Sequence, residues 1–75
     1  MGLQTKTTSE LIKIASAGAG FKLNAKTKTT SELIKIASAA ASGNAQVTFV
    51  GLNTKTTSEL IKIGSAGKGN IVIED

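Results

Sequence analysis

The sequence predicts a small α+β protein, an open-faced sandwich in which a mostly antiparallel sheet of about four strands carries three helices on one face. The string TKTTSELIKI occurs three times without change, at 5–14, 27–36 and 54–63, and each copy has the pattern of an amphipathic helix. Short segments with alternating apolar side chains stand between and after the copies. Helices with one apolar face and alternating strands suit a single sheet that is covered on one side.

Each copy of the string carries a helix start. The spacing of a capping box occurs in all three copies, at Thr7 and Glu10, Thr29 and Glu32, and Thr56 and Glu59. The apolar residues that follow in the first copy fill an arc roughly 160° wide at ~100° per residue. A strand is the alternative, because ELIKI partly alternates and is rich in β-branched residues. The Ala/Ser tail at 37–42 has no strand character and decides for a helix.

The predicted elements form one domain, 1–75, built from three βα-like repeats. These repeats are 2–20, 21–44 and 45–69, followed by a final strand at 70–74. In order we expect a helix at 7–18, a strand at 21–25, a helix at 29–42, a strand at 47–49, a short third strand in GLNT at 51–54, a helix at 56–66 and a strand at 71–73. Gly18, Gly43 and Gly67 stand where helices should stop. Repeat spacings of 22 and 27 residues argue against a regular solenoid, and whether 2–6 join the sheet stays open, as does the strand order.

The composition narrows the possible chemistry. The 75 residues include no cysteine and no histidine, which excludes disulfides, thiolate zinc sites and the usual neutral-pH proton shuttle. Arg, Pro, Trp and Tyr are also absent. This narrow alphabet and the unchanged repeats predict a chain that was designed or simplified.

The formal net charge of +4 has two interpretations. One is attraction to nucleic acid or acidic lipid. The other, which we favour, is a solubility charge spread over separate faces, because no aromatic residues are interleaved with the lysines to stack bases. No apolar run reaches the ~20 residues of a membrane span, and the N-terminus lacks the apolar core of a signal peptide. We therefore expect a soluble protein with cytoplasmic-type expression, no specific nucleic-acid partner and no membrane partner.

From Phe21 to Glu74 the chain resembles HPr, the histidine-containing phosphocarrier family. FKLNAKT looks like the family's first strand, SELIKIAS like the middle of its first helix, NTKTTSELIKIG like its run into the second helix, and GKGNIVIED like a later strand entry. The resemblance implies an antiparallel four-stranded sheet under three helices. In the family a loop with the phosphorylated histidine and an arginine follows the first strand. Here AKTKTTSEL runs straight through and both residues are missing, so the resemblance argues against the activity.

No residue set predicts a catalytic, cofactor-binding or metal site. GSAGKG at 64–69 has the wrong spacing for a P-loop and follows a helix instead of preceding one. Helix N-termini attract anions, and the candidate anion-binding residues are Thr29, Thr30, Ser31, Thr56, Thr57 and Ser58. Simple capping is the plainer interpretation, since a glutamate in each first turn would repel phosphate.

The first functional hypothesis is therefore a designed or idealised structural protein with an HPr-like fold and no catalytic activity. The alternative is a weak anion- or phosphate-partner-binding module that uses helix N-termini and lysines, and the third hypothesis is an enzyme or phosphocarrier. We also expect a homodimer. Val50-Gly51 makes a poor hairpin turn, because valine disfavours positive φ, so strands could be exchanged between two chains.

Overall fold

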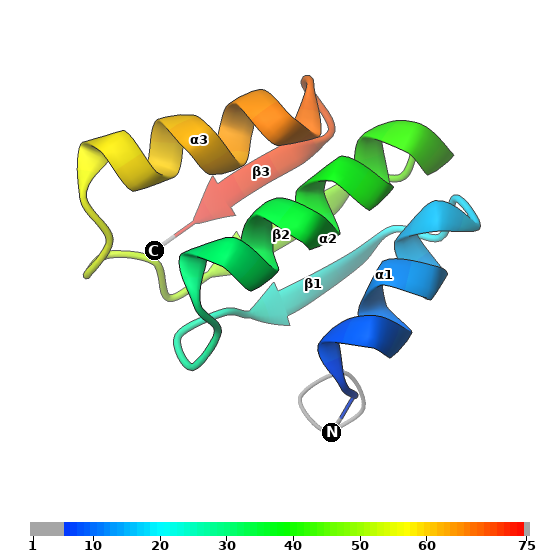
Figure 1. The fold of residues 1–75 in the computed structure, drawn as a ribbon, viewed down its shortest axis with the longest axis horizontal. Helices are drawn as coiled ribbons and strands as arrows, with labels where there is room; N and C mark the ends of the chain where they lie inside the picture. The colour runs from blue at the N-terminus through cyan, green and yellow to red at the C-terminus, as the bar shows by residue number, and fades with distance from the viewer. Residues whose placement is uncertain (1–5, 75) are drawn as a thin grey trace.

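The computed structural model describes residues 6–74, in which helices and strands alternate along the chain. The elements are α1 (Thr8–Ser16), β1 (Phe21–Asn24), α2 (Thr30–Gly43), β2 (Val47–Val50), α3 (Thr57–Gly67) and β3 (Ile71–Glu74). The three helices lie side by side in one layer over the sheet (Figure 1). The lead-in at 2–5, its possible place in the sheet, and Asp75 lie outside the described residues.

The sheet has three parallel strands in the order β1-β2-β3. Leu23 of β1 pairs with Phe49 of β2, and Phe49 pairs with Ile73 of β3. The expected mostly antiparallel sheet of about four strands is therefore wrong. The strands β1 and β2 are each followed by a helix that carries the chain back to the same end, so the next strand runs in the same direction.

The expected strand in GLNT is also wrong. The chain leaves β2 at Gly51, whose φ of +82° is a conformation that side chains disfavour. Leu52 then points into the core with only 2 % exposure, and Lys55 donates its backbone N–H to the Leu52 carbonyl to close a turn. Val50 and Gly51 therefore lead into α3 and form no hairpin, which removes the reason given for strand exchange.

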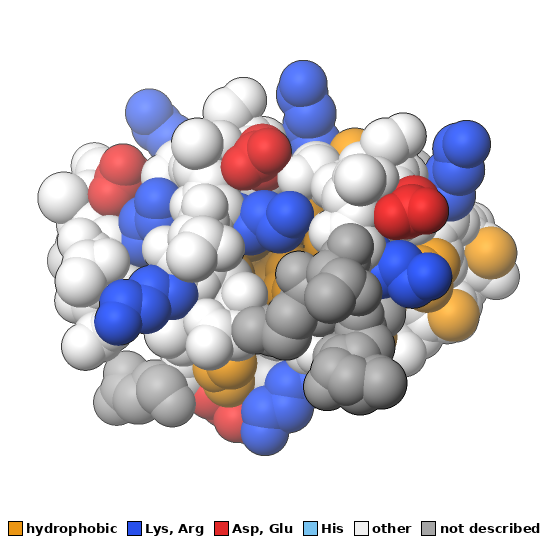
Figure 2. Space-filling model, turned by 90° about the horizontal axis from the view of Figure 1, so that it is seen from below, with side chains coloured by type: hydrophobic (Ala, Val, Ile, Leu, Met, Phe, Trp, Pro, Cys, Tyr) orange, Lys and Arg blue, Asp and Glu red, His pale blue; other side chains and the backbone are white. Residues whose placement is uncertain are grey.

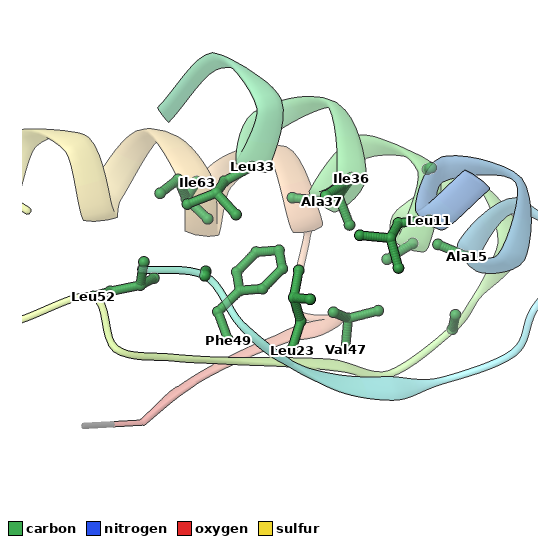
Figure 3. Close-up of a cluster of buried hydrophobic side chains, with 14 residues drawn as sticks. Leu11, Ala15, Leu23, Leu33, Ile36, Ala37, Val47, Phe49, Leu52 and Ile63 are labelled. Atoms are coloured by element: carbon green, nitrogen blue, oxygen red, sulfur yellow. The ribbon is translucent and has the colours of Figure 1, made fainter. Parts of the chain in front are cut away.

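The core lies between the helices and the sheet (Figure 3). Phe49 is fully buried near its centre and points from β2 toward the helix layer. The other core residues are Leu11 and Ala15 from α1, Leu33, Ile36, Ala37, Ala39 and Ala40 from α2, Ile63 from α3, Leu23 and Val47 from the strands, and Ala25, Ala45 and Leu52 from the connecting segments. Lys22 and Thr48, which are paired across β1 and β2, alternate with these core residues and so point to the opposite face of the sheet. Lys22 Nζ is 3.3 Å from Glu74 Oε1.

Two of the expected stop glycines, Gly43 and Gly67, are the last residues of α2 and α3. The C-cap residues that follow them, Asn44 and Lys68, adopt the left-handed conformation with φ of 57° and 48°. Gly43 is needed for packing, because a Cβ there would overlap the carbonyl oxygens of Ala15 and Ser16 at the end of α1. The unequal repeat spacing reflects mainly helix length, since α1 has 9 residues and α2 has 14.

Candidate functional site

The N-terminal ends of the three helices carry the same set of polar contacts. All three predicted capping boxes are present. In α2 the Thr29 hydroxyl accepts the Glu32 backbone N–H at 3.2 Å, and Glu32 Oε1 accepts the Thr29 backbone N–H at 2.9 Å. The same distances recur in the other two boxes, at Thr7 with Glu10 and Thr56 with Glu59.

Each of two glutamates also accepts a hydrogen bond from the preceding helix. The Thr8 hydroxyl of α1 donates to Glu32 Oε2 at 3.1 Å, and the Thr30 hydroxyl of α2 donates to Glu59 Oε2 at 3.2 Å. Lysines reach across the same gaps. Lys28 Nζ donates to the Thr8 hydroxyl at 3.2 Å, and Lys55 Nζ donates to the Lys28 carbonyl at 3.4 Å. We call these contacts the threonine–glutamate ladder.

These contacts lower the pKa of the three glutamates below the ordinary value of 4.5. The largest cause is the N-cap backbone N–H, donated by Thr7 to Glu10 and by its counterparts to the other two. The second cause of the lowered pKa at Glu32 and Glu59 is the hydroxyl of the preceding helix, Thr8 or Thr30. The three glutamates are therefore ionised at neutral pH. This agrees with their contacts, because their carboxylate oxygens only accept hydrogen bonds, as an ionised carboxylate does.

The candidate anion-binding residues are used in different ways. The Thr29 and Thr56 hydroxyls occupy the capping boxes, and the Thr30 hydroxyl is bonded to Glu59. Ser31, Thr57 and Ser58 are exposed. At each of these helix ends a carboxylate stands beside the hydroxyls, and its negative charge would repel an incoming phosphate. Among these six residues, Thr30 is the one whose hydroxyl reaches a glutamate of the neighbouring repeat. Anion binding stays an untested prediction.

Residues 6–74 contain no group of acidic side chains placed to hold a metal ion, and no pocket is formed by them. Positive and negative side chains are interspersed over the face that Figure 2 presents. None of the helices between residues 6 and 74 is long and apolar enough to cross a bilayer.

The exposed apolar residues at one end of the array were not predicted. Ile61 of α3 is 62 % exposed, while its equivalents Ile12 and Ile34 are half-buried. On β3, Val72 and Ile73 are 38 % and 40 % exposed. The signal was present in the sequence: identical copies that pack on one another must leave one copy at each end with an unpaired side.

Comparisons with known proteins give no relative from which a function could be carried over. No family model, no curated protein and no solved structure matches this chain. The antiparallel fold implied by the resemblance to HPr is not the fold observed. The function must therefore be argued from the geometry alone.

Proposed function

We propose that this chain is a structural repeat module whose copies serve to pack on one another in a parallel βα stack. The observation that carries the proposal is the threonine–glutamate ladder, which joins α1 to α2 through Thr8 and Glu32 and α2 to α3 through Thr30 and Glu59. The polar side chains of the repeated string are thus used for contacts between copies. The apolar side chains are used in the shared core.

This arrangement is typical of proteins built by repetition. Each unit contacts its neighbours, so stability is approximately the sum of the unit stabilities and the contacts between adjacent units. A chain organised in this way tolerates a change in the number of units, because a new unit meets the same surfaces on both sides. A protein with one specific reaction centre has no such freedom.

The test is to insert a second copy of residues 25–50 directly after Val50. We expect a folded protein with one more helix and one more parallel strand, and with a higher free energy of unfolding in denaturant. A matched control inserts the same residues in scrambled order and should lower the stability. If the repeat insertion also abolishes cooperative unfolding, the modular account is wrong.

A titration with inorganic phosphate at low salt separates this proposal from the anion-binding alternative. The repeat module should show no saturating chemical-shift change at residues 29–31 or 56–58. A saturating change at those residues that weakens steeply with added salt would favour an anion-binding role instead.

A further inference from the structure

The two internal helix interfaces use the same positions of the repeated string. At each one, the threonine at the first helical position donates to the glutamate of the next helix. We call the side of a helix that faces the next helix its trailing flank, and the side that faces the preceding helix its leading flank. Thr8 and Thr30 mark trailing flanks, while Glu32 and Glu59 mark leading flanks.

Helix geometry assigns further residues of α2 to each flank. At ~100° per residue, Glu32, Ile36 and Ala39 fall within about 60° of one another and form the leading flank. Thr30 and Ile34 fall within about 40° of each other on the other side and form the trailing flank. Both Ile36 and Ala39 are buried, and Ile34 is half-buried.

The equivalent surfaces at the two ends of the array are exposed. On α1 the leading flank consists of Glu10 and Ala17, which are exposed, and Ile14, which is half-buried. On α3 the trailing flank consists of Thr57, which is exposed, and Ile61 at 62 % exposure. The ten-residue string is identical in all copies, and Ala17 corresponds to Ala39 beyond it. These two end surfaces therefore have the side chains that already fit together inside the chain.

The edge strands at the two ends of the sheet could pair with each other in the register that the inner pairs use. In the sheet, β1 and β3 are the edge strands, and an edge strand offers unpaired backbone groups to another strand. The observed pairing matches Phe21 with Val47, and Val47 with Ile71. Continuing that register would place Phe21 of another copy opposite Ile71. Lys22 and Glu74, which pair at 3.3 Å within the chain, would then also lie on neighbouring strands of two copies.

We propose that copies of this chain associate head to tail, with the trailing flank of α3 and the outer edge of β3 of one copy packed on the leading flank of α1 and the outer edge of β1 of a second copy. This inference rests on the proposed repeat function and identifies the partner as the same chain. Thr57 of one copy donates to Glu10 of the next, as Thr8 donates to Glu32. Because the two surfaces differ, a head-to-tail pair still has one free surface of each kind, so further copies can be added.

The first test is the mass of the native chain in sedimentation equilibrium from about 1 μM to about 1 mM, which spans the affinities of small interfaces. We expect the average mass to rise continuously past two chains. A mass that stops at two chains would contradict the open assembly and favour a symmetric or strand-exchanged dimer. A monomer mass throughout, together with a folded repeat-insertion variant, would overturn head-to-tail association while leaving the repeat proposal intact.

The second test blocks one end at a time. Ile61→Glu places a charge on the trailing flank, and Ala17→Glu places one on the leading flank, and both residues are exposed in the single chain. Each variant alone should be monomeric, whereas a mixture of the two should form a one-to-one complex through the unblocked flanks. Ser38→Glu on the solvent side of α2 adds the same charge and should leave the association of the chain unchanged. A mixture that stays monomeric while the native chain still grows would show that other surfaces are used.

Discussion

The Thr30 hydroxyl of α2 donates a hydrogen bond of 3.2 Å to Glu59 Oε2 of α3, across the boundary between two repeats. The contact repeats the bond between Thr8 and Glu32 one unit earlier. Two copies of one string thus recognise each other through residues that also start the helices. We expect four consequences of this arrangement and of the packing behind it.

Replacing Thr30 by valine should lower the melting temperature. Valine keeps the branched shape but removes the hydroxyl, so Glu59 loses its bond from the preceding helix. The matched control is Thr57→Val in α3, whose hydroxyl has no hydrogen-bond partner among residues 6–74. Thermal unfolding at a concentration where the chain is monomeric should separate the two. Equal decreases in melting temperature in the two variants would mean that the hydrogen bond from Thr30 to Glu59 adds nothing to stability beyond the effect of helix propensity.

The three helix caps should contribute similar amounts to the free energy of unfolding. Replacing Thr7, Thr29 or Thr56 by alanine removes the acceptor for the backbone N–H three residues later. Each variant should lose about 1 kcal/mol in the free energy of unfolding, measured with urea. Serine at the same positions keeps a hydroxyl acceptor and should lose much less. Unchanged or higher stability in all three alanine variants would refute the capping role.

Gly64 in α3 should be replaceable by alanine with a gain of about 0.5–1 kcal/mol. A Cβ at Gly64 meets no atom within 4 Å, and alanine has a higher helix propensity than glycine. Gly43→Ala in α2 is the contrasting variant, because its Cβ would overlap the carbonyl oxygens of Ala15 and Ser16. That variant should lose about 1–3 kcal/mol as α1 and α2 are forced apart. If urea unfolding ranks the two variants in the opposite order, the close approach of these helices is incorrect.

Stability should fall in acid because the pKa of Glu10, Glu32 and Glu59 is lowered in the folded state. As the pH decreases, the glutamates of the unfolded chain bind protons first, because their pKa is the ordinary value of about 4.5. The stabilisation from the lowered pKa values is therefore complete above about pH 4.5 and is lost below it, as the pH passes the pKa values of the folded state. Melting temperatures measured at a series of pH values from neutral to acid would show the decrease in stability. A variant with glutamine at all three positions should show a smaller decrease, since glutamine can still cap but does not titrate. The same decrease in that variant would assign the effect to other groups.

The helices and strands, and their order, followed from local patterns. The capping boxes at Thr7, Thr29 and Thr56 fixed the helix starts, and the alternation around Leu23 and Phe49 fixed two strands. The expected antiparallel sheet was wrong because it depended on the resemblance to HPr and on a strand in GLNT. Leu52 is apolar for a different reason: it fills the core beneath α3. Without that extra strand, every strand is separated from the next by a helix, and this alternation predicts a parallel sheet.

The candidate site was less accessible to sequence reasoning. The spacing of Thr29 and Glu32 predicts a contact within one helix, and that contact is present. The bond from Thr8 to Glu32 depends on how two helices sit side by side, which follows only once the strands are known to be parallel and adjacent. The exposed flank at Ile61 likewise becomes visible only when the order of the stack is known.

The parallel pairing of the strands is the claim on which the ladder and both proposals depend. It can be measured directly from backbone nuclear Overhauser effects in the Ile61→Glu variant, in which pairing between chains should be blocked. We predict cross-strand contacts that join Leu23 to Phe49 and Phe49 to Ile73, with neighbouring pairs advancing in the same direction along all three strands. Contacts that advance in opposite directions, such as Phe21 with Val50 and Asn24 with Val47, would show an antiparallel sheet and contradict the account.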